Sequence, residues 1–172
     1  KNFNNDFVST LIQKLLPIIN SRESAREGAI DAVLQSVNNI NDQQIYIFVL
    51  TAFNWATSND SIALTLIRHS DTILTRKHTE FPSKLREFAS RISSSNNSNN
   101  RIRLCDELSK CHLLFQSSKG GFRNIFKSIA DDQDLNVRLN FLTNFSKLYS
   151  SNVIGTNSAN ERDFYCKRLV QF

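Results

Sequence analysis

One short segment combines the residue types of a hydrolase triad. Arg68-His69-Ser70-Asp71 supplies a nucleophile, a base and a carboxylate in four consecutive positions. Neighbouring positions on one helix cannot point at one another in the nucleophile, base and orienter geometry that catalysis needs. No other segment resembles a nucleophile elbow or a phosphate-binding loop. We therefore expect no catalytic residue.

A second segment offers soft metal ligands. Cys105 and Cys111 are followed by His112, but the Cys-x5-Cys spacing differs from the hairpin spacing that lets two thiolates share one zinc ion. On a helix, positions 105, 108, 111 and 115 form one apolar stripe, and free cysteines are usually buried. The favoured interpretation is a pair of core cysteines, with no metal site.

Gly120-Gly121 is preceded by Lys119, but no phosphate-loop pattern surrounds it. Its simpler interpretation is a helix end followed by a turn. The chain has only three His and no His-x3-His pair. The sequence thus predicts no metal, no cofactor and no enzyme activity.

Composition favours a helical protein of a reducing compartment. The chain has 172 residues, of which 40% are hydrophobic, with only 4 Gly and 2 Pro. Three cysteines at unremarkable spacing argue against a secreted disulfide scaffold and favour the cytosol or nucleus. No apolar run is long enough to cross a bilayer, so we expect no membrane partner. Because Lys1 is not Met and the chain ends on apolar residues, we expect a piece of a longer protein.

Apolar residues recur at three- and four-residue steps, which is the period of a helix face. The fold class we predict is all-α, with stacked antiparallel helix pairs arranged as an α-solenoid or as a compact helical bundle, in one domain over residues 1–172. The expected helices cover residues 7–19, 25–37, 42–56, 62–74, 82–92, 104–115, 122–129, 135–149 and 158–172.

Three of these elements carry more detailed predictions. The helix over 42–56, capped by Asn41 or Asp42, should be the most deeply buried. Residues 135–149 are apolar on several sides, so we expect neighbours on both sides of that helix. Residues 93–100 contain only Ser and Asn after the helix end and predict a mobile loop.

First members of successive helix pairs begin near residues 5, 42, 82 and 120, close to a 40-residue repeat. The segment 131–139 resembles the turn and second-helix start of a HEAT repeat, because an acidic turn precedes Val137 and Arg138. That resemblance implies that Val137 packs inward and that Arg138 bridges to an Asp of an adjacent repeat. Residues 137–145 also look somewhat like helical repeats of proteins with a PCI domain, such as translation initiation factor subunits.

The middle of the chain is basic. Between Ser61 and Ala130 there are 12 Lys and Arg against 5 Asp and Glu, a net +7, within a chain of net +5. If these helices stack, a positive face would form that holds phosphates or an acidic peptide. The residues expected to bind a partner there are Lys84, Arg86, Arg91, Arg101, Arg103, Arg123 and Lys127.

Two functions remain open at this point. The first is a non-catalytic scaffold or adaptor that binds a protein partner or an acidic peptide through a helical-repeat surface. The second is an RNA-binding or nucleocapsid-like helical protein that uses the basic segment 84–127. Ordinary solvated Lys and Arg are the simplest interpretation of the same charges.

Overall fold

The computed structural model describes residues 5–38, 40, 42–76, 78–117, 121–150 and 159–170. Every regular element in these ranges is a helix, which confirms the all-α fold class. None of the described helices is long and apolar enough to span a bilayer. The chain divides into two compact units, Lys1–Phe88 (unit 1) and Ala89–Phe172 (unit 2). That residues 1–172 form one cooperative domain, whether solenoid or bundle, stays a prediction.

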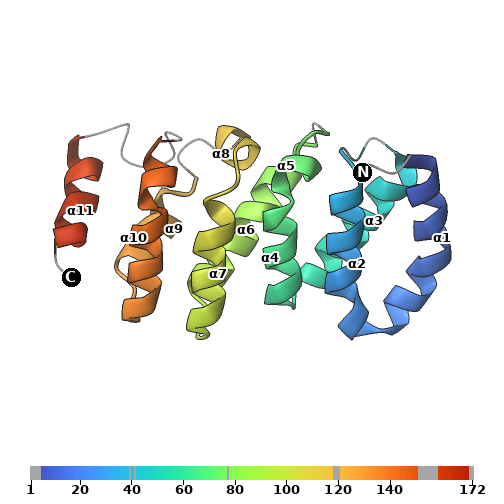
Figure 1. The fold of residues 1–172 in the computed structure, drawn as a ribbon, viewed down its shortest axis with the longest axis horizontal. Helices are drawn as coiled ribbons and strands as arrows, with labels where there is room; N and C mark the ends of the chain where they lie inside the picture. The colour runs from blue at the N-terminus through green and yellow to red at the C-terminus, as the bar shows by residue number, and fades with distance from the viewer. Residues whose placement is uncertain are drawn as a thin grey trace. The chain divides into compact units, whose positions relative to one another are not determined.

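Unit 1 is built from five helices and the first part of a sixth. They are α1 (Asn5–Ser21), α2 (Glu23–Ser36), α3 (Gln43–Ala56), α4 (Asp60–Arg68), α5 (Ser70–Ile73) and α6 (Phe81–Ser93), inside which the boundary falls. Helix α1 packs against α2 and α3, and these two also pack against α4. In Figure 1, α2 and α4 lie side by side.

Helix α3 is deeply buried on one side, but the prediction that it is the most deeply buried helix is wrong, because six of the nine residues of α4 are buried. Its buried residues are the six that the apolar pattern selects, namely Ile45, Phe48, Val49, Ala52, Phe53 and Ala56. The Asp42 carboxylate accepts hydrogen bonds from the amides of Gln44 and Ile45, at 2.8 and 3.2 Å, so Asp42 caps this helix. Asn41, the alternative cap, lies outside the described residues.

Helix ends in unit 1 differ from the expected ends at two points. Helix α1, expected to end at residue 19, continues to Ser21, whose hydroxyl donates to the Ile18 carbonyl at 2.9 Å. The helix expected over 62–74 is divided into α4 and α5 at His69, whose φ of −95° and ψ of 17° are not helical. Asn59 caps α4 by accepting from the amides of Ser61 and Ile62.

The core of unit 1 includes a group of aromatic rings around Phe81. The Phe81 ring stacks on Phe53 at 5.0 Å between centroids and on His78 at 4.5 Å. Tyr46 lies 5.9 Å from Phe81, and Phe88 lies 5.8 Å from Phe53. These contacts join α3 to the start of α6 through ring packing, which adds to the free energy of burial.

Unit 2 contains the remainder of α6 and five further helices. They are α7 (Ser98–Leu108), α8 (Leu113–Ser117), α9 (Arg123–Ala130), α10 (Leu135–Ser150) and α11 (Ala159–Val170). Helix α10 packs against α7 and α9, and α11 packs against α9. Phe126 and Tyr165 flank the buried Phe141 ring at 6.3 and 5.9 Å between centroids.

Two expected elements of unit 2 have different boundaries. The helix over 104–115 is divided, because the turn 109–112 separates α7 from α8. The loop expected over 93–100 is reduced to residues 94–97, since the Asn97 side chain accepts the Asn99 amide at 3.0 Å and starts α7 at Ser98. Lys119, Gly120 and the predicted Ser158 cap lie outside the described residues.

Each unit contains a carboxylate that binds two side chains one turn apart on another helix of the same unit. In unit 1, Glu27 of α2 accepts from the hydroxyls of Ser61 and Thr65 on α4, at 2.5 and 3.3 Å. In unit 2, Asp106 of α7 accepts from the amides of Asn140 and Asn144 on α10, both at 2.9 Å. In both units, the carboxylate residue precedes its two partners by 34 and 38 residues along the chain. We call these two arrangements the polar clamps.

Candidate functional site

The segment with triad residue types is engaged in packing. His69 Nε2 lies 2.8 Å from Asp31 Oδ1, and Arg68 donates to the same oxygen at 3.3 Å. The hydroxyl-bearing Ser70 is fully buried. The carboxylate partner of His69 is therefore on α2, and the contacts tie α2 to α4.

These contacts predict an acid-dependent part of the stability. The hydrogen bond with His69, and then the charges of His69 and Arg68, hold the pKa of Asp31 below its ordinary value against the opposing effect of burial. A lowered pKa stabilises the fold above the pKa of the unfolded chain and is lost as the pH falls through the folded value. The stability gap between the parent and Asp31→Asn should therefore shrink below about pH 4 in urea titrations. A gap that is constant down to pH 2 would contradict this assignment.

The three cysteines form no disulfide with one another. Cys105 and Cys111 are buried, as the apolar stripe predicts, although Cys111 lies in the turn after α7 and not on that helix. Burial, with a smaller effect of the Asp106 charge, raises the pKa of the Cys105 thiol to about 12. This thiol is protonated at neutral pH. In the described ranges, no three His, Cys, Asp or Glu side chains gather where they could hold a metal ion.

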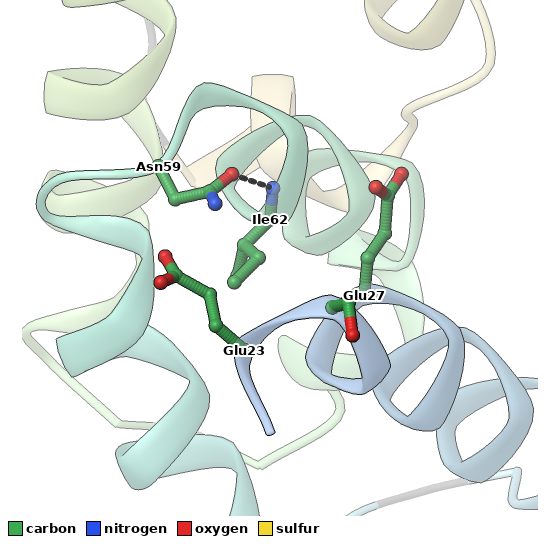
Figure 2. Close-up of a pocket in the computed structure, with 5 residues that line it drawn as sticks. Glu23, Glu27, Asn59 and Ile62 are labelled. Carbon is green, nitrogen blue, oxygen red and sulfur yellow. Dashed lines mark hydrogen bonds between the residues drawn. The ribbon is translucent and has the colours of Figure 1, made fainter. Parts of the chain in front are cut away.

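Unit 1 has a small polar pocket of about 440 Å³ (Figure 2). It is lined by Glu23, Ser24 and Glu27 of α2 and by Asn59 and Ile62 at the start of α4. The Asn59 oxygen is occupied by the Ile62 amide, at 3.1 Å, and the Glu27 carboxylate belongs to the polar clamp. The pocket thus offers mainly acceptors, which suit a hydrogen-bond donor or a cationic group. The acidic pair at 23 and 27, one turn apart on α2, is a sequence signal that we did not single out.

The seven residues expected to form one basic face are divided between the two units. Lys84 and Arg86 belong to unit 1, where Lys84 is exposed and Arg86 half-buried. The other five belong to unit 2, in which Arg123 is exposed and the remainder are half-buried, namely Arg91, Arg101, Arg103 and Lys127. Lys127 Nζ lies 5.4 Å from the centroid of the Phe164 ring, a cation–π contact.

Arg101 is held inside unit 2, so its assignment to an exposed basic face is corrected. Its guanidinium binds both oxygens of Asp132, at 2.6 and 2.8 Å, and donates to the Ser95 carbonyl at 2.5 Å. The side chains of Arg101 and Asp132 are only 13% and 7% exposed. The hydrogen bond to Asp132 raises the pKa of Arg101. Such a buried bidentate pair serves packing and is not available to a phosphate.

The acidic turn 131–134 gathers arginines from several helices. Asp131 pairs with Arg168 of α11 at 2.6 Å, while Arg138 of α10 donates to the Asp132 carbonyl at 2.7 Å. Val137 is fully buried, as the resemblance to a HEAT repeat implies. Arg101 also reaches this turn, from α7, which lies earlier in the chain.

Exposed large apolar side chains form rows on three helices. On α1 they are Phe7, Leu11, Leu15 and Ile18; on α3 they are Ile47 and Leu50; on α10 they are Leu135, Leu139 and Leu142. Among the described residues, these nine are the large hydrophobic side chains with high exposure. Because they follow the helix period, each set forms one continuous stripe.

The apolar patterns of α1 and α10 include both buried and exposed residues. Phe7, Leu11 and Leu15 share an apolar pattern with Val8 and Ile12, but only the latter two are buried. Helix α1 packs against α2 and α3, and its side that carries Val8 and Ile12 is the buried one. On α10, the several apolar sides predicted neighbours on both sides, yet the side that carries Leu139 is exposed.

Comparisons with protein-family models, with curated proteins and with solved structures give no match. The fold therefore shows only the structural class. The chain is an all-α protein of packed helices with exposed apolar rows.

Proposed function

We propose that the chain is a non-catalytic scaffold or adaptor module that binds a protein partner inside the cell, in the cytoplasm or the nucleus. Binding uses a surface of repeated helices. The polar clamps support the idea of repetition, because the same 34- and 38-residue separations occur in both units. The odd number of free cysteines supports a reducing compartment.

The apolar rows carry this proposal. Surface helices usually present polar residues to water, whereas contiguous exposed apolar stripes are typical of surfaces that bind other proteins. The row on α1 contains four large side chains and the row on α10 contains three. An enzyme needs polar groups that converge at a cleft, whereas binding a protein through the apolar rows does not need such groups.

A photo-crosslinking amino acid placed at Leu11 or at Leu139 tests the proposal in cells. We expect both positions to give protein adducts that survive ribonuclease treatment, because the proposal places a protein on these rows. The matched control carries the same crosslinker at Asn124, an exposed polar position on α9. Equal adducts from all three positions, or adducts with nucleic acid alone, would refute protein binding through the rows.

RNA binding is the second candidate, and the charge of unit 2 favours it. Unit 2 holds 12 Lys and Arg against 7 Asp and Glu, a net +5, whereas unit 1 holds 9 of each and is neutral. A phosphate-binding surface loses affinity steeply as salt rises, because the release of counterions into a more concentrated salt solution is less favourable. If RNA is the partner, the triple variant Arg91→Glu, Arg103→Glu and Arg123→Glu, whose three positions all lie in unit 2, should weaken binding at low salt. Arg101 is left unchanged because of its buried pair.

A further inference from the structure

The strongest unexplained surface in unit 2 is the outer side of α10. Leu135, Leu139 and Leu142 are 51%, 42% and 36% exposed, and their spacings of four and three residues align them along one stripe. At about 100° per residue, this stripe lies nearly opposite the buried side of α10. The buried side packs against α7 and α9 and consists of Val137, Phe141, Asn144 and Leu148.

The helix that carries this leucine row has only positive charge. Helix α10 contains two basic residues, Arg138 and Lys147, and no acidic residue. Arg138 follows Leu135 by three positions and precedes Leu142 by four, so it flanks the row directly. The row therefore has a positive border at Arg138.

The acidic side chains of unit 2 are largely engaged within the unit. Asp132 and Asp131 bind Arg101 and Arg168, and Asp106 belongs to a polar clamp. Glu107 lies 3.2 Å from Lys110, and Asp163 lies 2.6 Å from Lys167. Asp134, which directly precedes the leucine row, accepts the Asn136 amide at 2.8 Å, and α10 itself has no acidic residue that would cancel the net +5 of unit 2.

We propose that the leucine row of α10 is the docking surface for an amphipathic helix of another protein whose apolar stripe is bordered by Asp and Glu. Leucines at three- and four-residue steps match the anchor spacing of a helix that lies along a helical surface. The positive border selects acidic flanks and repels basic ones. A second copy of this chain is disfavoured as the occupant, because two units of net +5 would face each other. This inference rests on the proposed function and names the partner of one of its rows.

The probes are two synthetic helical peptides with the same leucine stripe, flanked by Glu in one and by Lys in the other. Binding to the full chain is followed by fluorescence anisotropy at low salt. We expect the Glu-flanked peptide to bind, and the Lys-flanked peptide to bind at least about tenfold more weakly. Leu139→Gln should weaken binding of the Glu-flanked peptide by a further factor of roughly ten, as loss of a central anchor does.

Leu11→Gln is the matched control, since Leu11 on α1 is 40% exposed and Leu139 is 42% exposed. It should change peptide affinity by less than about twofold, because it lies outside the leucine row of α10. Circular dichroism and a thermal melt show that both variants remain folded. Absence of peptide binding, equal affinity for both peptides, or unchanged binding by Leu139→Gln would overturn the proposal.

Self-association is followed by sedimentation of the parent and of Leu139→Gln. A dimer that Leu139→Gln abolishes would make a second copy the occupant and overturn the acidic partner. If crosslinks from Leu11 to protein persist in cells while the peptides fail, the scaffold function stands and the α10 assignment falls. If cellular adducts contain only RNA while the Glu-flanked peptide binds, the α10 assignment stands and the scaffold function falls.

Discussion

Asp132→Ala is expected to lower the free energy of unfolding by about 1.5–3 kcal/mol, because it removes two charge-assisted hydrogen bonds of the half-buried Arg101 guanidinium. The Asp132 carboxylate receives two hydrogen bonds from Arg101 and a third from the Asp134 amide at 2.8 Å. With Arg101 at only 13% exposure, water cannot replace these bonds. Urea unfolding followed by circular dichroism measures the loss.

Asp131→Ala is the matched control from the same turn. The Asp131–Arg168 pair has the same 2.6 Å contact, but its side chains are 44% and 39% exposed. Exposed pairs contribute only about 0.2–1 kcal/mol, so this substitution should be mild. The double variant Arg101→Met with Asp132→Leu should recover most of the stability, since it removes both buried charges. Equal effects of Asp132→Ala and Asp131→Ala would show that the burial of Asp132 is unimportant.

Phe81→Ala should cost unit 1 about 3–5 kcal/mol through the cavity that it leaves. The ring is 1% exposed and stacks on both Phe53 and His78, so no solvent or flexible side chain stands ready to fill the space. Thermal unfolding by calorimetry measures the shift. The same scan tests the prediction of one cooperative domain, for which a single transition is expected.

Phe7→Ala provides the control for Phe81→Ala. Phe7 is 56% exposed on α1, so its removal should change stability by less than about 1 kcal/mol. If Phe7→Ala proved as damaging as Phe81→Ala, the apolar row on α1 would have to be covered in solution.

Local patterns predicted the helices and the interior of α3 well. The six core residues of α3 fall within one arc of the helix, and Asp42 supplies a cap that is readable from sequence. Interruptions were harder to predict, because His69 divides α4 from α5 within a run that is apolar on both sides. Apolar periodicity reports which face is hydrophobic and does not report where the backbone leaves the helix.

The candidate binding surface was less predictable for a physical reason. Charge counting placed Arg101 on a basic face, but its partner Asp132 is 31 residues away and no local pattern marks the pairing. The row at Leu139 was visible as excess hydrophobicity, and only the packing of α10 shows which side stays exposed. The pairing of Arg101 and the exposure of Leu139 both depend on residues that are distant in the sequence. Local patterns in a single sequence do not identify those residues.

The polar clamps also determine how neighbouring helices can slide. Apolar contacts alone tolerate displacement along the axis, because one methyl group substitutes for another. A carboxylate such as Asp106, held by Asn140 and Asn144 one turn apart, would lose one amide if α10 moved by a turn of about 5.4 Å. A half-turn shift would lose both and leave polar groups unsatisfied. Each clamp therefore allows only one position of its two helices relative to each other along their axes.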